Sequence, residues 1–226
     1  MQQPIPDLAK VIDHTFLRPD GQKSDIDRLC REAKHYGFYA VCLYPAYISY
    51  AKSLLKNTPT NICTVVGFPH GATTTQIKEY ETRKTVEEGA DEIDMVINIG
   101  ALKDKRYDFV KNEIYSVVKA AAGRVVKVII ETSLLSINEK ITASKLCVDG
   151  GAHFIKTSTG FAPSKESDSA KASDVALIRK AIGQQVGIKA SGGIRNVADA
   201  QKMLAAGATR LGTSSSVSIM SGLILP

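Results

Sequence analysis

The stretch Val125-Val126-Lys127-Val128-Ile129-Ile130, VVKVII, is apolar and β-branched at every position except Lys127. A strand with only one buried face alternates between polar and apolar residues, and this one does not. The pattern is typical of a strand covered on both faces, as in a parallel sheet flanked by helices. The segment therefore predicts an α/β protein with a lysine inside one buried strand.

Seven further segments have the apolar, β-branched composition of short strands closed by turn residues. They are Val11–Ile12, Ala40–Leu43, Ile62–Val66, Ile93–Ile97, Phe154–Lys156, Gly187–Lys189 and Arg210–Gly212. Helical periodicity lies between them, for example at Ile114, Val117, Val118 and Ala121. Strand and helix thus alternate about eight times, and no low-complexity linker divides the chain.

Eight alternating units in 226 residues predict a single-domain (β/α)8 TIM barrel of the α/β class that spans residues 1–226. A doubly wound open sheet is the structural alternative, and it normally carries a glycine fingerprint after its first strand. Here the first strand leads into DHTFLRPDG, residues 13–21, which has no such pattern. The closed barrel is therefore favoured, with an active site at the carboxyl ends of its strands.

The composition is that of an ordinary globular protein, with 44% apolar and 23% charged residues. No run of about 18 apolar residues is present, which predicts no membrane-spanning helix. The N-terminal MQQPIPDLAK lacks the order of a signal peptide, so we expect a cytoplasmic protein. The net charge is +6, but the basic residues form no block, and no nucleic-acid partner is expected.

The cysteines and histidines show no spacing typical of a metal site. The four cysteines, Cys30, Cys42, Cys63 and Cys147, have no CxxC spacing, and the four histidines form no HExxH or paired cluster. Free thiols in a reducing compartment are expected. No protein-built zinc site is predicted.

Lysine occurs in three consecutive predicted strands, as Lys127 in VVKVII, Lys156 in FIKTSTG and Lys189 in GIKASGG. Lysine is almost never fully buried without a partner, and a barrel gathers its strand ends on one face. Desolvation and a neighbouring cation both favour the neutral amine, the form that attacks a carbonyl. The lysines together predict a Schiff-base nucleophile, although each alone also fits a side chain that reaches the barrel end or pairs with a carboxylate.

Acidic residues occur in GADEIDMVINIG, residues 89–100, where Glu92 and Asp94 share one face of a strand. Asp94 lies within the apolar run, where a carboxylate needs a cation or a hydrogen-bonded role. Two interpretations remain open for it. One is a structural ion pair with Lys127, and the other is a proton relay beside the nucleophilic lysine.

The last two predicted units carry the pattern of a phosphate site. Gly192, Gly193 and Gly212 allow a close approach of the backbone to an anion. Ser214 and Ser215 begin an expected short helix, whose free amide groups favour phosphate. The loops after strands seven and eight are the usual phosphate site of a barrel.

Segments along nearly the whole chain, from about Ile12 to Ser216, resemble the deoxyribose-phosphate aldolase family. They are VCLYP, VVGFPHGATTT, GADEIDMVINIGAL, KVIIETSLL, FIKTSTGF, IKASGGIR and RLGTSS. The resemblance implies a TIM barrel and a class I aldolase that needs no cofactor and no metal. It also implies reversible cleavage of 2-deoxy-D-ribose 5-phosphate to acetaldehyde and D-glyceraldehyde 3-phosphate, and a homodimer or larger homo-oligomer.

The same resemblance assigns roles to individual residues. The family's Schiff-base lysine falls on Lys156, its second, proton-relaying lysine on Lys189 and its catalytic aspartate on Asp94. Substrate and phosphate binding fall on Gly160, Gly192, Gly193, Gly212, Ser214, Ser215, Lys127 and Cys42. Cys42 taken alone fits a buried structural thiol.

The chain departs from some family members at Phe161, where they carry a lysine. Two other functions stay open at this point. One is a non-covalent, phosphate-binding barrel isomerase or synthase with Asp94 as its base. The other is a barrel without catalytic activity that binds sugar phosphates or a partner protein.

Overall fold

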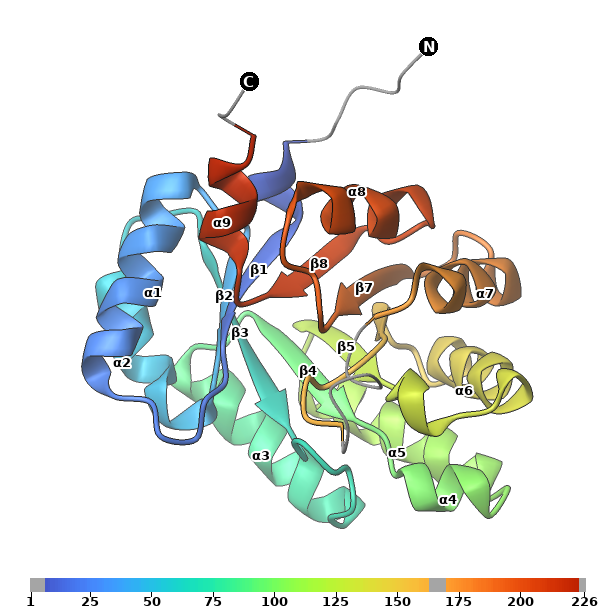
Figure 1. Ribbon diagram of the computed structural model, residues 1–226. Helices are drawn as coiled ribbons and strands as arrows, with labels where there is room; N and C mark the ends of the chain where they lie inside the picture. The colour runs from blue at the N-terminus through green and yellow to red at the C-terminus, as the bar shows by residue number, and fades with distance from the viewer. Residues whose placement is uncertain (1–6, 163–169, 224–226) are drawn as a thin grey trace.

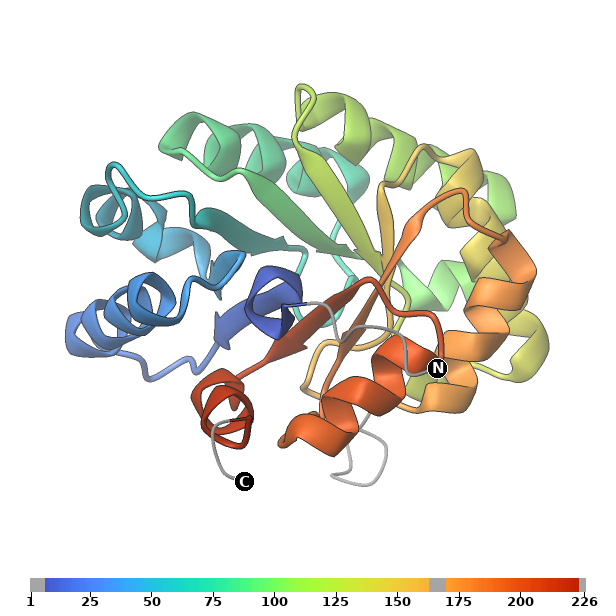
Figure 2. The same ribbon diagram turned by 90° about the horizontal axis from the view of Figure 1, so that it is seen from above.

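The computed structural model describes residues 7–162 and 170–223, and the rest of the predicted domain lies outside the described residues. Eight parallel strands close into a barrel in chain order, with β1 beside β8 (Figures 1 and 2). They are β1 (Ile12–Phe16), β2 (Ala40–Leu43), β3 (Asn61–Val66), β4 (Glu92–Val96), β5 (Val125–Ile129), β6 (Phe154–Lys156), β7 (Gly187–Ser191) and β8 (Arg210–Thr213). The predicted (β/α)8 fold is confirmed.

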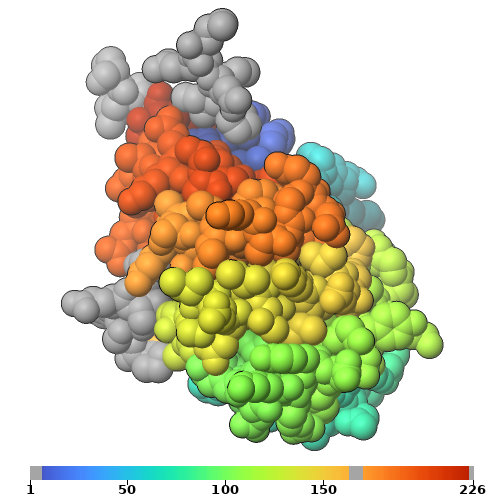
Figure 3. All heavy atoms as spheres, turned by 90° about the vertical axis from the view of Figure 1, so that its right-hand side faces the viewer, coloured from blue at the N-terminus to red at the C-terminus, as the bar shows by residue number. Residues whose placement is uncertain are grey.

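The helices form a ring outside the strands. They are α1 (Lys23–Tyr36), α2 (Ile48–Leu54), α3 (Thr75–Glu88), α4 (Ile99–Lys103), α5 (Tyr107–Ala120), α6 (Ile137–Asp149), α7 (Ala172–Ile182), α8 (Val197–Ala205) and α9 (Ser216–Ser221). Figure 3 shows α5 to α8 following one another in chain order along one flank of the molecule. None of the described helices is both long and apolar enough to cross a membrane.

Among the predicted strands, the first is the one whose position was wrong. The prediction gave Val11–Ile12, whereas β1 runs from Ile12 to Phe16 and Val11 ends a short 3-10 helix, Leu8–Val11. The sequence IDHTF lacks the apolar pattern of a strand because it places Asp13 inside the barrel, where cations from other strands compensate its charge. The other predicted strands agree with the observed ones to within two residues.

Alternation along each strand separates an outer core from the barrel interior. In β5, Val126 and Val128 belong to the large apolar core between barrel and helices. Lys127, between them, points inward and meets carboxylates. A second, smaller apolar cluster contains Leu17, Ala40, Cys42, Cys63 and Val65. The interior of the barrel is therefore apolar beside β2 and β3 and charged beside β4 to β8 and β1.

Candidate active site

The three strand lysines converge on the carboxylate of Asp94. Oδ2 of Asp94 accepts hydrogen bonds from the amines of Lys156 and Lys189, each at 2.8 Å. Its other oxygen, Oδ1, accepts one from Lys127, also at 2.8 Å. All four side chains are buried. The predicted convergence is confirmed, and both interpretations of Asp94 describe real contacts, because it pairs with Lys127 and also with Lys156.

Register explains how residues far apart in the sequence reach one point. Asp94 of β4 is the direct partner of Lys127 in β5, and Lys156 of β6 is the partner of Lys189 in β7. All four occupy inward positions of parallel strands, so their side chains enter the same layers of the barrel.

Two members of the charged interior were not predicted. Asp13 of β1 accepts from Lys189 and, at 2.8 Å, from Nη1 of Arg210. Arg210 of β8 also reaches Glu92 at 2.9 Å, and its guanidinium stacks on Tyr39, 3.6 Å from the ring centroid. Asp13 is the second residue of its strand and Arg210 the first of its own. Neither position in the sequence reveals what the side chain faces across the barrel.

Burial and opposite charge act against each other on these groups. Burial raises the pKa of the Asp94 carboxyl, but the three neighbouring lysines outweigh it and hold that pKa well below its usual range. Burial lowers the pKa of Lys189, but the carboxylates of Asp13 and Asp94 outweigh it, and the pKa is raised. The pKa of Lys127 is raised well above its usual value for the same reason. The neighbouring cations therefore do not bring the pKa of Lys189 or Lys127 below its usual value, because carboxylates lie between them.

A cavity of about 370 Å³ opens above this cluster. Its lining includes all the glycines and serines predicted to bind phosphate, namely Gly160, Gly192, Gly193, Gly212, Ser214 and Ser215. Two arginines that the sequence interpretation did not consider, Arg18 and Arg195, also line it. The lining contains none of the three lysines, nor Asp94 or Cys42, and all five side chains are buried within the barrel.

Gly212 connects the cavity with the lysines. A Cβ atom at this position would lie 2.7 Å from Oγ of Ser191 and 2.8 Å from Cε of Lys189, closer than real side chains approach. Any larger residue at this position would displace the side chain of Ser191 or Lys189, so glycine leaves Lys189 its path beneath the cavity. Helix α9 begins at Ser216, one or two residues later than expected, with Ser215 as its N-cap residue.

The loop after Lys156 is fixed by a buried carboxylate. Glu131 follows β5, and its Oε2 accepts a hydrogen bond from the backbone N–H of Thr159 at 3.0 Å and another from the Thr159 hydroxyl. Beyond it, Phe161 is 42% exposed and packs edge-to-face on Phe68, with the ring centroids 5.4 Å apart. The loop therefore presents Gly160 to the cavity and an aromatic side chain to its rim.

This combination of closed parallel barrel, buried lysines on one carboxylate and a glycine-rich cavity above them is the one expected of a barrel aldolase that works through lysine. Comparison with known proteins gives the family. Residues 8–224 match the DeoC/LacD family aldolases. The chain belongs to this family and is an aldolase.

Individual relatives agree along nearly their full length. A protein of Dictyoglomus turgidum named deoxyribose-phosphate aldolase is 56% identical over 217 residues, which cover 96% of this chain and 97% of that protein. One of Staphylococcus epidermidis with the same name is 54% identical over 215 residues, 95% of this chain and 96% of that protein. A tetrameric deoxyribose phosphate aldolase structure from Aeropyrum pernix superposes with a TM-score of 0.89 at 32% identity, covering 98% of this chain and 93% of that one.

Proposed function

We propose that this aldolase cleaves 2-deoxy-D-ribose 5-phosphate reversibly to acetaldehyde and D-glyceraldehyde 3-phosphate, with Lys156 as the Schiff-base nucleophile. One observation carries the choice of lysine. Within the described residues, Lys127 has three carboxylates within 4.0 Å and Lys189 has two, whereas Lys156 has Asp94 alone. Lys156 must also share the Asp94 oxygen that Lys189 uses.

A charge count supports the same lysine. The buried cluster contains four basic side chains, Lys127, Lys156, Lys189 and Arg210, and three carboxylates, Asp13, Glu92 and Asp94. If all are ionised, one positive charge is in excess. Loss of one proton balances the cluster, and the loss removes the fewest ion pairs at Lys156. Lys156 is therefore the lysine that we propose as the nucleophile.

In the synthesis direction, the amine of Lys156 attacks acetaldehyde, and loss of water gives an iminium ion. A proton leaves the methyl carbon, and the resulting enamine attacks the aldehyde carbon of glyceraldehyde 3-phosphate. Water then hydrolyses the new iminium ion and frees the amine. Asp94 and Lys189 exchange the protons. Asp94 contacts the nitrogen of Lys156, and Lys189 contacts the same oxygen of Asp94.

The cavity above the cluster is proposed to hold the phosphate. Gly192 and Gly193 have positive φ angles of 94° and 69°, a backbone conformation that favours glycine and turns the loop after β7. Arg195 adds positive charge to the same lining, and Arg18, which is paired with Asp20, adds further donors. Holding the phosphate there positions the three-carbon aldehyde over the enamine, so that binding energy remote from the reacting carbon is used for orientation.

The test is reductive trapping. The protein is incubated with acetaldehyde and borohydride, and its intact mass is measured before peptide mapping. We expect one reduced two-carbon adduct of about 28 Da, on Lys156, because only an imine is reduced to a stable product. An adduct on Lys189 or Lys127 would contradict the assignment of the nucleophile. No adduct from acetaldehyde or from deoxyribose 5-phosphate would favour the non-covalent isomerase or synthase.

Three broader properties belong to the same proposal. We infer that residues 1–226 form one aldolase domain, that it assembles as a homodimer or larger homo-oligomer, and that it acts in the cytoplasm. Support for assembly comes from the tetrameric relative of Aeropyrum pernix. Sedimentation of the full chain tests the assembly directly.

A further inference from the structure

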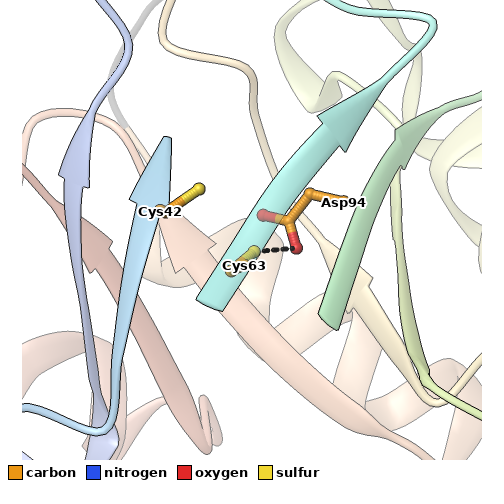
Figure 4. A group of neighbouring side chains, drawn as sticks. All are labelled: Cys42, Cys63 and Asp94. Atoms are coloured by element: carbon orange, nitrogen blue, oxygen red, sulfur yellow. Dashed lines mark hydrogen bonds between the residues drawn. The ribbon is translucent and has the colours of Figure 1, made fainter. Parts of the chain in front are cut away.

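Two thiols and one carboxylate meet inside the barrel in an arrangement that the aldol reaction does not use as a whole. Cys42, Cys63 and Asp94 point toward one another from β2, β3 and β4 (Figure 4). One donor atom of each lies within 4.8 Å of the other two. Sγ of Cys63 lies 3.2 Å from Oδ1 of Asp94. All three residues are fully buried.

Strand register produces this grouping. Cys42 and Cys63 are direct partners in neighbouring strands, and both point inward. Asp94 lies one strand further along the barrel, where its Oδ1 faces Cys63. The separation of 21 residues between the cysteines follows from the β2–α2–β3 unit and resembles no zinc-binding spacing. For this reason the sequence did not predict the group.

The donor atoms and their separations suit a thiophilic divalent cation. Zn²⁺ binds thiolate sulfur at about 2.3 Å and carboxylate oxygen at about 2.0–2.2 Å, so tetrahedral geometry places such donors about 3.5–3.8 Å apart. The sulfur–oxygen distance of 3.2 Å is within a few tenths of that range. Three protein donors leave the fourth position to water, as in many zinc sites.

Binding of such an ion leaves the net charge that the neighbouring lysines face unchanged. When M²⁺ binds two thiols, two S–H bonds break, two M–S bonds form and two protons leave. The charge of the group made by Cys42, Cys63 and Asp94 is therefore −1 before and after binding. Nζ of Lys127 lies 3.2 Å from Sγ of Cys63 and 2.8 Å from Oδ1 of Asp94, so this ammonium group turns away from both atoms when the ion binds.

We propose that Cys42, Cys63 and Asp94 form an inhibitory site for a thiophilic divalent cation such as Zn²⁺. An ion there takes Oδ1 of Asp94, to which Lys127 now donates. It draws the carboxylate toward β2 and away from Lys156 and Lys189. Lys156 and Lys189 then lose their shared contact with Asp94, and the aldolase is inactive until the ion leaves. Only the inhibitory part rests on the proposed function, because the site itself follows from the geometry.

A second group, Asp13, Cys63 and Glu92, satisfies the same distance criterion. It offers one sulfur in place of two, and its carboxylates already bind Arg210. Soft cations favour sulfur donors, so the group with two thiols is the better site. Cys63 belongs to both groups and Cys42 to one, which allows variants to separate them.

The first experiment measures binding without reference to activity. Full-length protein in a phosphine reductant is titrated with Cd²⁺, and ultraviolet absorption from thiolate-to-metal charge transfer is followed. We expect saturation at one ion per chain, and loss of the signal in Cys42→Ala and in Cys63→Ala. Cys147→Ala is the matched control, because this thiol of α6 is equally buried and belongs to neither group. It keeps the full signal.

The second experiment measures turnover of deoxyribose 5-phosphate with and without Zn²⁺, each variant being compared with its own metal-free rate. We expect at least ~10-fold inhibition of the native protein at saturating Zn²⁺, reversal by EDTA, and little inhibition of Cys63→Ala. Cys63→Ser replaces it if the alanine variant does not fold, because serine keeps a hydroxyl beside Asp94 and is a poor ligand for Cd²⁺.

Several results would overturn the proposal. One is the absence of a charge-transfer signal from the native protein, and another is an equal signal in all variants. A signal lost in Cys63→Ala but kept in Cys42→Ala would assign the ion to Asp13, Cys63 and Glu92 instead. Inhibition reversed by a thiol reductant but not by EDTA would indicate oxidation. Cd²⁺ binding as predicted, with no imine trapped by borohydride, would leave the site standing and remove the proposed function.

Discussion

Two regions of the molecule bury lysine completely, and they treat its charge in opposite ways. In the barrel interior, Lys127 and Lys189 lie among carboxylates from several strands. In the helix layer, Lys78 of α3 pairs with Glu113 of α5 at 2.8 Å and donates to the carbonyl oxygen of Val96 at 2.8 Å. Both side chains of that pair are 0% exposed.

The pKa directions differ between the two regions. Burial lowers the pKa of Lys78, and the attraction of Glu113 does not overcome it. Burial likewise raises the pKa of Glu113 despite Lys78. In the barrel, burial is outweighed, and the pKa of Lys189 is raised. Several opposite charges around each group are thus needed before attraction exceeds desolvation. A buried lysine is therefore no mark of catalysis by itself, and the arrangement of its partners decides.

The largest expected difference between the regions is in catalysis. Lys156→Ala is expected to lower kcat for deoxyribose 5-phosphate cleavage by at least ~10³-fold, because the covalent nucleophile is lost. The matched variant in the helix layer is Lys78→Met combined with Glu113→Gln, which removes a buried lysine and its charge partner. Its kcat is expected to stay within about twofold of the native value, since within the described residues the Lys78 amine binds Glu113 and Val96 and no member of the cluster. Steady-state kinetics on both proteins checks the pair.

The next difference is in stability. Asp13→Asn removes the carboxylate between Lys189 and Arg210 and leaves two buried cations undercompensated. We expect the free energy of unfolding to fall by about 3–5 kcal/mol, as when one partner of a buried ion pair is removed. Urea denaturation at pH 7 measures it. Asp20→Asn is the control, since the ion pair of Asp20 with Arg18 is 65% and 71% exposed and its loss should leave stability unchanged. Similar losses of stability in Asp13→Asn and Asp20→Asn would contradict the argument that burial makes the charge of Asp13 important.

The same contrast explains which parts of the site the sequence predicted. Lys127 and Asp94 stand out because each interrupts an apolar run, and Lys156 because it ends one, and a closed barrel brings the inward positions of its strands together. Asp13 and Arg210 do not stand out, because the strand that contains Asp13 is mostly polar and Arg210 begins its strand. Their partners lie 118 or more residues away in the sequence. Cys63 gained its significance only from register with Cys42. Local pattern predicts elements and faces, whereas contacts across a closed barrel require the register of all eight strands.

A smaller effect is expected when the whole charge pair of the helix layer is replaced. Lys78→Met with Glu113→Gln is expected to lose only about 1–3 kcal/mol of stability, because the ion-pair attraction lost is matched by desolvation no longer required and the remaining cost is the Val96 carbonyl that loses its donor. Glutamine keeps an acceptor for the backbone N–H of Asn98, which Glu113 accepts at 3.0 Å. Lys78→Met alone leaves Glu113 uncompensated and should cost about 3–5 kcal/mol. Equal losses in the single and double variants would show that the pair is strongly stabilising and that the two regions are alike.

The smallest effect is the pH dependence of that pair. The unfolded lysine keeps its proton up to about pH 10.4, whereas folded Lys78 has a lowered pKa and releases it earlier. Between the folded and unfolded values the unfolded state binds more protons, so the stability of the native protein relative to the double variant rises with pH. Glu113 has a raised pKa and holds its proton above about pH 4.3, so its contribution falls as pH rises through that window. The stability of the native protein relative to the double variant should therefore be lowest near neutral pH. It should rise toward both acidic and alkaline pH. Urea midpoints from pH 4 to pH 10 test this, and a native advantage that peaks at neutral pH would mean that attraction exceeds desolvation here, as it does in the barrel.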